Sequence, residues 1–376
     1  MKSRAGSLTL AGLAVLVGLA QAVPYDRHNP KGTNAVGCPP FNASTFVIDE
    51  FQLYPENAKF DSNRCLVYFG VLFNASVGVF NPYTKDLETI LLPGISGDPA
   101  LHLGPALPDA DGHLTVLVDA GAAFNTGGQD ISGANIVLKY DLDNRQVIWQ
   151  RNITELVTQG AWGGFQDVEH DKDGNIYIVG TFPGTVLRVD KDGNGLKPFF
   201  LPPADELANK TNAGFGGLAS VRERDLILTN NNVDGQLYRF DGVSGSETGT
   251  PVLIPRTGPN GTLPSAPIGF SDAVLLPAKY NNTVLLVAED AAGVWVVRSK
   301  DGKWESAETL GLVSNNVPEA QGGQVPAAVQ IGPDALFMLE EYFIDPIVPG
   351  TNAGNRTSFP IVSITAQVDE LLRKFP

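Results

Sequence analysis

One pattern recurs six times along this chain of 376 residues: an apolar run, a tight polar turn, a second apolar run, a glycine-bearing loop and a further apolar run. The second run of each unit begins, in order, at Leu66, Leu114, Ile176, Leu226, Val284 and Leu336. The units therefore follow one another at about 50 residues, a period typical of propeller blades. Short strands of this kind bury their faces only by stacking against neighbours around a ring. The sequence predicts an all-β fold, a six-bladed β-propeller.

The two ends of the repeat predict how the ring closes. The sixth unit supplies only three apolar runs, whereas an extra run, Phe46 to Leu53, precedes the first unit. We expect this N-terminal strand to complete the sixth blade, because closure leaves no long strand edge exposed. Val368, Leu371 and Leu372 recur at helical spacing, which predicts a short C-terminal helix on the outside of the ring.

Residues 1–22 are predicted to be a secretory signal peptide. Lys2 and Arg4 precede an apolar stretch, and Ala20-Gln21-Ala22 resembles a cleavage site. The expected organisation is then an arm over residues 23–45 and the propeller over 46–376. No later segment approaches the ~20 apolar residues that a spanning helix needs, so we expect no membrane span and a location in the secretory pathway, extracellular or lumenal.

Passage through the secretory pathway allows cysteines to form disulfides and N-x-S/T sequences (sequons) to be glycosylated. Cys38 and Cys65 are expected to form one disulfide in an oxidising compartment, the alternative being two unrelated buried thiols. Seven N-x-S/T acceptors predict glycosylation: Asn42, Asn74, Asn152, Asn209, Asn260, Asn281 and Asn355.

The formal net charge of −15 argues against nucleic acid as a partner, because no basic cluster offsets it. Acidity and glycans together favour a monomer.

The turns indicate which end of the ring carries the function. Asp-Gly and Asn-rich hairpins between first and second strands share one rim, so the starts of the innermost strands and the loops joining second to third strands meet at the other. Candidate residues on that second rim are Glu56, Asn57, His102, Asp119, Phe124, Gln166, Asp167, Phe182, Phe215, Asn231, Asp272, Glu289, Asp290, Gln324 and Tyr342.

From this set we predict Glu56, His102 and Asp167 as proton-transferring or charge-stabilising residues. Neighbouring carboxyls acquire different pKa values, and a histidine exchanges protons near neutrality. The remaining residues that we assign to substrate binding are Asn57, Phe124, Gln166, Phe182, Phe215, Asn231, Asp272, Glu289, Gln324 and Tyr342. The alternative is that these polar strand starts only hydrate a central channel. The long insertion Gly121 to Ala134 is a candidate lid over the pocket or an ordinary surface loop.

Several chemistries have no motif in the chain. There is no G-x-S-x-G elbow, no phosphate loop and no pair of histidines at ligand spacing. The sequence predicts no redox cofactor and no phosphoryl transfer.

Four motifs in order carry a resemblance to a known family: YPENAKFD (54–61), GGFQDVEHD (163–171), VGTFPGTVLRVD (179–190) and QVPAAV (324–329). The chain resembles the fungal secreted propeller proteins encoded in trichothecene toxin gene clusters. This resemblance implies a six-bladed propeller acting on or beside terpenoid-type metabolites, for example as a ring-forming tailoring protein, and a contribution to virulence.

A more distant likeness is to the gluconolactonase and senescence-marker propellers, which hold a divalent metal between a Glu, an Asn and an Asp. Glu56 matches their Glu, but Gly216 stands where the Asn precedes a Gly-Leu pair, and only Asp272 could replace the Asp. A metal site formed by Glu56 and Asp272 is therefore an alternative, and no metal is predicted as the leading case.

Three functions follow as hypotheses. The first is binding of a small apolar metabolite with cofactor-independent cyclisation or rearrangement. The second is a metal-dependent lactonase or esterase, and the third is a metabolite-binding or virulence protein without catalysis.

Overall fold

The computed structural model describes residues 37–376 except 42–43, 155, 157–161 and 263–266. The predicted signal peptide, most of the predicted arm and the sequon at Asn42 lie outside the described residues. Residues Gly37–Pro376 form one unit.

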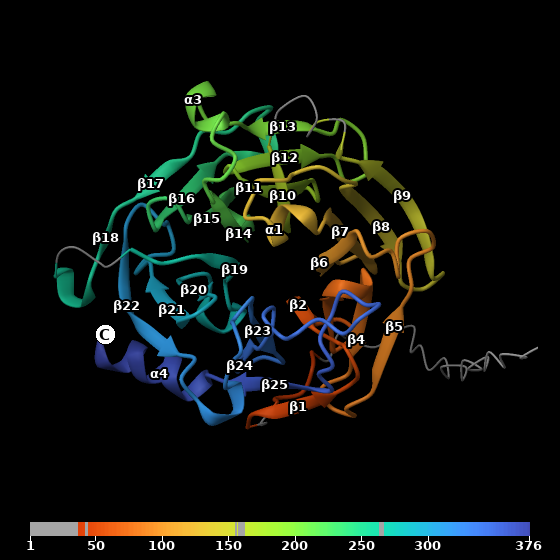
Figure 1. Ribbon diagram of the computed structural model, residues 1–376. Coiled ribbons are helices and arrows are strands. Elements are labelled where there is room, and N and C mark those ends of the chain that lie inside the picture. Colours follow the sequence, from red (N-terminus) through yellow and green to blue (C-terminus); the bar gives the residue numbers. More distant parts are fainter. Residues whose placement is uncertain (1–36, 42–43, 155, 157–161, 263–266) are drawn as a thin grey trace, which may run out of the picture. The chain divides into compact units, whose positions relative to one another are not determined.

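Six antiparallel sheets stand around a common centre, as Figure 1 shows. Blade 1 contains β2 (Pro55–Asp61), β3 (Leu66–Val71), β4 (Ser76–Phe80) and β5 (Leu87–Ile90). Blade 2 contains β6 (Leu101–Pro108), β7 (His113–Ala120), β8 (Ile136–Asp141) and β9 (Gln146–Asn152). Blade 3 contains β10 (Gly163–His170), β11 (Ile176–Phe182), β12 (Thr185–Val189) and β13 (Lys197–Phe200).

The second half of the chain continues the same order. Blade 4 contains β14 (Phe215–Val221), β15 (Leu226–Asn231), β16 (Gln236–Asp241) and β17 (Val252–Ile254). Blade 5 contains β19 (Ser271–Leu275), β20 (Val284–Glu289), β21 (Gly293–Arg298) and β22 (Ala307–Ser314), to which the short β18 (Arg256–Thr257) adds in parallel. Blade 6 contains β23 (Ala328–Ile331), β24 (Ala335–Leu339), β25 (Ser358–Ser363) and β1 (Phe46–Asp49). The predicted six-bladed propeller is confirmed.

Closure by the N-terminal strand is also confirmed. β1 pairs antiparallel with β25, with Phe46 opposite Ile361 and Asp49 opposite Ser358. The helix α4 (Thr365–Lys374) follows β25 directly and buries Val368 against blades 5 and 6. Figure 1 shows α4 at the outer edge of the ring, as its helical spacing predicted. No helix of the described residues is long and apolar enough to cross a membrane.

Apolar side chains form the core between the blades. Six clusters of buried residues are found in the described part of the chain, each joining two neighbouring sheets. The innermost strands are buried on both faces, whereas the outer strand β9 alternates between exposed and half-buried residues. Burial of both faces explains why the inner strands read as continuous apolar runs, and alternation marks a strand with one wet face.

A β-bulge interrupts five of the innermost strands at the same level. The register shifts between Glu56 and Lys59 in β2, and equivalent shifts occur in β6, β10, β14 and β19. A bulge places two residues opposite one and redirects side chains. The bulges therefore decide which residues near the strand starts face the centre of the ring.

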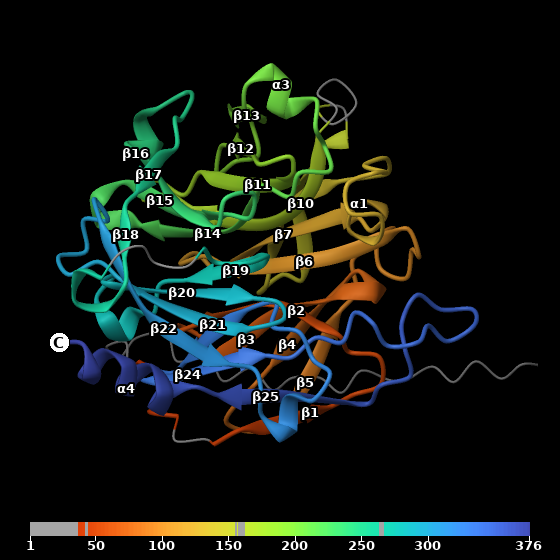
Figure 2. The same ribbon diagram turned by 60° about the vertical axis from the view of Figure 1, so that its left-hand side comes forward.

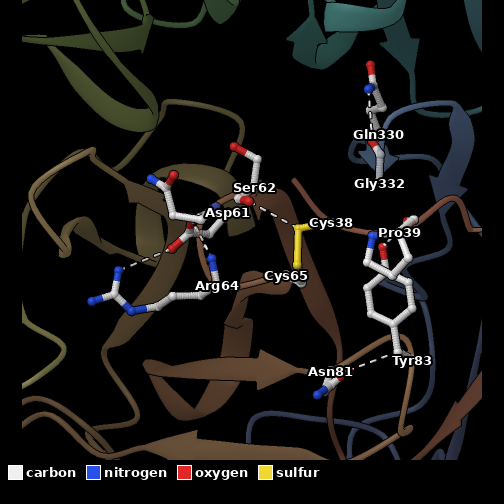
Figure 3. The surroundings of a disulfide bond; sticks show 11 residues. Cys38, Pro39, Asp61, Ser62, Arg64, Cys65, Asn81, Tyr83, Gln330 and Gly332 are labelled. Atoms are coloured by element: carbon white, nitrogen blue, oxygen red, sulfur yellow. Dashed lines mark hydrogen bonds and ion pairs between the residues drawn. A yellow bond between two sulfur atoms is a disulfide. The ribbon is translucent and has the colours of Figure 1, made fainter. Parts of the chain in front are cut away.

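The predicted disulfide between Cys38 and Cys65 is present, with Cα atoms 5.5 Å apart (Figure 3). It fastens the segment before β1 to the β2–β3 hairpin. The Tyr83 hydroxyl donates a hydrogen bond to the Pro39 carbonyl at 2.8 Å in the same region. The disulfide thus holds the chain at the seam where the ring closes.

Candidate functional site

A cavity of about 650 Å³ opens at one end of the ring. Its wall is made by the starts of innermost strands and by loops that join second to third strands. Figure 2 shows two of its parts at the same end of the ring: the helix α1 (Ala122–Asn125) and the long blue connection between β24 and β25. The volume is that of a site for a drug-sized molecule.

Aromatic and aliphatic side chains form most of the wall. The lining aromatic and aliphatic residues are Tyr54, Leu72, Phe73, Pro99, Phe124, Phe165, Phe182, Ala213, Phe270, Tyr342, Phe343 and Ile347. Phe124 of α1 meets Phe182 edge to face, with ring centroids 5.7 Å apart. The predicted lid insertion therefore contributes one side of the cavity, and Asn125 and Gly127 line it as well.

Polar cross-links between blades that are not neighbours lie at the centre of the ring. The Gln166 amide of blade 3 donates to the Asp272 main-chain oxygen of blade 5 at 3.0 Å and also to the Asp272 carboxylate. The Asn57 amide of blade 1 donates to Asp167 of blade 3 at 2.9 Å. These bonds join blades that are not neighbours in the ring, so side chains connect blades 1, 3 and 5 directly.

Glu56 and Asp119 are buried acids on one side of the cavity. Burial raises the pKa of Glu56 well above its usual range, and the nearby Asp272, Asp119 and Asp167 raise it further. Burial likewise raises the pKa of Asp119, which is only 3% exposed and whose Oδ1 has no hydrogen-bond partner among the described residues. Burial therefore shifts both groups toward their protonated forms.

Asp272 and Asp290 form a hydrogen-bonded carboxyl pair that also lines the cavity. Burial raises the pKa of both, and the charge of Asp272 raises that of Asp290 further. Hydrogen bonds from Asp290 and Gln166 limit the rise in the pKa of Asp272. Asp290 therefore keeps the proton and Asp272 carries the charge, which gives an acid and a base side by side.

His102 lies in the cavity wall beneath the loop that leads into α1. Its ring meets Phe73 edge to face at 5.3 Å, and a Cβ atom on Gly121 would come within 2.5 Å of its Nε2. Glycine at 121 is what allows this close approach. Burial lowers the pKa of His102 to about 4, so its imidazole is neutral at pH 7.

The mouth of the cavity is stiffened by a polar cluster. Arg356 donates two hydrogen bonds to Asp345, at 2.7 and 2.8 Å, and its guanidinium lies 3.4 Å from the centroid of the Tyr342 ring. The Tyr54 hydroxyl donates to the same carboxylate at 3.0 Å. This cluster fixes the long β24–β25 connection against blade 1.

Of the thirteen residues to which the sequence assigned a catalytic or binding role, seven line the cavity: Glu56, His102, Phe124, Gln166, Phe182, Asp272 and Tyr342. The other six do not belong to its lining: Asn57, Asp167, Phe215, Asn231, Glu289 and Gln324.

Asp167 is fully buried and accepts hydrogen bonds from Asn57 and from the Leu218 main-chain nitrogen, both at 2.9 Å. Lys59 approaches it at 3.3 Å. This arrangement ties blades 1, 3 and 4 together, a structural role that the sequence did not indicate.

The other four have local partners. Phe215 packs among Phe200, Tyr238 and Phe240 between blades 3 and 4. Asn231 accepts a bond from its own turn, and Glu289 accepts bonds from Gly269 and Trp295. The main chain of Gln324 pairs with Glu341.

Sequence reasoning gave no role to Tyr54, Asp345 or Arg356, and it left Asp119 and Asp290 without an assigned function. Asp119 carried a usable signal, because it interrupts the apolar run of its strand one residue before the strand ends. In the structure it lies opposite His102 in the register of β6 and β7. The pairing of Asp345 with Arg356 spans a loop and had no such pattern.

Comparison with known proteins gives the family. A model of the Mal s 1 allergenic protein-like family matches residues 34–311. The chain belongs to this family. It is 35% identical over 356 residues to trichothecene biosynthesis protein 14 of Trichoderma arundinaceum, covering 89% of this chain and 92% of that protein. It is 30% identical to core trichothecene cluster protein 14 of Fusarium sporotrichioides, covering 89% and 88%.

The fold of the family is known from a solved structure, that of the major allergen Mala s 1 of Malassezia sympodialis. It superposes with a TM-score of 0.69 at 20% identity and covers 85% of this chain and 96% of that one. The two trichothecene-cluster relatives confirm the resemblance stated from the four motifs, and they suggest a role in secondary metabolism.

The metal centre of the distantly similar gluconolactonase propellers does not fit these residues. A Cβ atom on Gly216 would lie 2.4 Å from the Ser271 carbonyl oxygen, so an asparagine has no room where those propellers have a ligand. The Asp272 carboxylate accepts a hydrogen bond from the Gln166 amide, so it is already paired within the protein. Among the described residues no group of three His, Cys, Asp or Glu is arranged to hold a metal ion.

Proposed function

We propose that this protein binds an apolar, terpenoid-type metabolite in the cavity and promotes its cyclisation or rearrangement without a redox cofactor. The observation that carries this proposal is the pairing of Asp272 with Asp290, an ionised and a protonated carboxyl in the wall of a cavity that is otherwise mainly aromatic. The two trichothecene-cluster relatives support the class of metabolite.

The proposed ring closure needs two proton movements and no electron transfer. One carboxylic acid, Asp290 or Glu56, gives its proton to an electron-rich atom of the ligand, an alkene carbon or an epoxide oxygen. A hydroxyl of the same molecule forms the new bond to the electron-poor carbon, and its proton passes to the Asp272 carboxylate. The product is an isomer of the ligand, and one proton exchange between the carboxyls restores the site.

The cavity contributes by holding the ligand in a reactive conformation. Positioning alone can supply several kcal/mol of the barrier, up to about 7–11 kcal/mol in favourable intramolecular cases. The neutral imidazole of His102 can donate or accept a hydrogen bond beside the reacting atoms.

The test is incubation of the purified protein with hydroxylated sesquiterpenoid intermediates, followed by chromatography and mass spectrometry. We expect a product of unchanged mass, formed about 100-fold more slowly by Asp272→Asn and by Glu56→Gln, since acid–base groups contribute on this scale. Glu319→Gln, a change at an exposed glutamate that does not line the cavity, is the matched control and should keep the wild-type rate.

Two results would overturn the proposal. Saturable binding without conversion, across a panel of such intermediates, would support a carrier or virulence protein without catalysis. Hydrolysis of lactones that a chelator abolishes would support the metal-dependent alternative.

We also infer passage through the secretory pathway. The disulfide and the exposure of all six described sequon asparagines support this inference. Treatment of the native protein with an N-glycosidase should lower its apparent mass, and an unchanged mass would count against glycosylation.

A further inference from the structure

We infer that the cavity is selective for positive charge: it binds an apolar molecule carrying a cationic centre in preference to neutral or anionic molecules of the same shape. The inference rests on the proposed function, for which it names the kind of charge that develops on the ligand. A ring closure begun by protonation places positive charge on carbon, and the cavity would stabilise that charge.

The first observation is the charge balance of the wall. Glu56, Asp119, Asp272, Asp290 and Asp345 contribute carboxyl groups, while no Lys or Arg occurs among the described residues that line the cavity. An anionic ligand would meet several carboxyl groups there and no Lys or Arg side chain with which to pair. A cation would meet at least one ionised carboxylate at short range in surroundings that water does not fully screen.

The second observation is independent of the acidic cluster as such. Asp119 is only 3% exposed, and it lines the cavity. One of its carboxyl oxygens has no hydrogen-bond partner in the described part of the chain. A buried acceptor left unpaired costs free energy. A ligand that brings an N–H donor or a positive centre to Asp119 removes that cost, whereas a ligand with only acceptors does not.

The aromatic wall has the same preference. Ring faces attract cations through their quadrupole, by about 0.5–2 kcal/mol for each well-placed contact. Phe73, Phe124 and Phe182 surround the space beside His102 and Asp119. Anions gain nothing from these faces.

Two cations close to the cavity wall are already paired with carboxylates. Arg356 is held by Asp345 at the mouth and Lys59 by Asp167 behind the wall. Burial keeps His102 neutral at pH 7. Within the described lining itself, no charged Lys, Arg or His therefore opposes a bound cation.

The test uses three probes that share one aromatic body: naphthylmethylamine, which is protonated at pH 7, naphthylmethanol and naphthoic acid, which is ionised. Dissociation constants are measured on the full-length mature protein by fluorescence and calorimetry at low salt. We expect the ammonium to bind about tenfold more tightly than the alcohol, and the carboxylate more weakly than both. Equal affinities, preference for the carboxylate, or binding of none of the three would overturn the inference.

A variant locates the effect. Asp119→Asn should reduce the preference for ammonium over alcohol about fivefold while leaving the affinity for the alcohol within about twofold, and Glu319→Gln should change neither. A circular dichroism spectrum identical to wild type shows that the variant is folded. If Asp119→Asn binds the ammonium as wild type does, Asp119 has no part in the selectivity.

The outcome is separable from that of the proposed function, because binding is measured without turnover. Ammonium preference in a protein that converts no intermediate would leave this inference standing and remove the enzyme. Conversion of an intermediate by a protein that shows no preference for the ammonium probe would overturn this inference and leave the proposed enzyme standing.

Discussion

Asp167→Asn should destabilise the propeller and affect any chemistry only through that loss. Asp167 lies at the bulge of β10, completely buried, where blades 1, 3 and 4 approach one another. Its two oxygens accept bonds from Asn57 and from the main chain of Leu218, and Lys59 pairs with it at 3.3 Å. An asparagine would keep one accepting oxygen and point an N–H₂ group at a donor.

The magnitude follows from those contacts. A hydrogen bond to a charged group contributes about 1.5–3 kcal/mol, and breaking one side of a buried ion pair costs about 3–5 kcal/mol. Because these terms overlap, we expect Asp167→Asn to lower the free energy of unfolding by about 3–5 kcal/mol. That is a large share of the roughly 5–15 kcal/mol that stabilises a typical domain.

The assay is urea unfolding followed by tryptophan fluorescence, with Asp192→Asn in an exposed turn as the matched control. Asn57→Ala should cost about 1.5–3 kcal/mol alone, and the double variant should show a coupling energy above ~0.5 kcal/mol. A change below about 1 kcal/mol, together with lost conversion, would refute this reasoning and restore Asp167 as the catalytic residue that the sequence suggested.

Two further predictions concern the seam and the buried acids. The double variant Cys38→Ser, Cys65→Ser should lower the free energy of unfolding by about 3.5 kcal/mol, which is the loop-entropy value for a separation of 27 residues. Reductant should lower the stability of the wild type but not that of the variant. A wild type whose stability does not change with reductant would contradict this. The free energy of unfolding should fall from pH 7 to pH 9. Burial raises the pKa of Glu340 in the folded state to about 9. In this pH range only the folded protein holds the Glu340 proton, so rising pH favours the unfolded state. Glu340→Gln should reduce the slope by up to about 1.4 kcal/mol per pH unit, and a stability that rises over this range would show that the sign is wrong.

The strand pattern was predictable because the second strand of each blade is buried on both faces. The apolar runs predicted starts at Ile176 and Leu226, and β11 and β15 begin at those residues. The two ends of the chain were predictable for a similar reason: an unfinished sixth unit needs a partner, and β1 supplies it.

Side-chain direction near the axis was not predictable, because a bulge changes which face each residue occupies. Gln166 and Asp167 are adjacent in the sequence, yet only Gln166 lines the cavity. Phe215 begins β14 on the expected rim, but its ring packs against Phe200 and Phe240 between blades 3 and 4. Such contacts join blades far apart in the sequence, and no local pattern encodes them.

The central claim is that the acidic pair Asp272–Asp290 acts on a metabolite in the cavity. The most direct measurement is metabolite profiling of the source organism with the gene deleted and then restored as wild type or as Asp272→Asn. The account predicts that one uncyclised precursor accumulates after deletion, disappears with the wild-type gene and persists with the variant. An unchanged profile after deletion, or full rescue by Asp272→Asn, would contradict it.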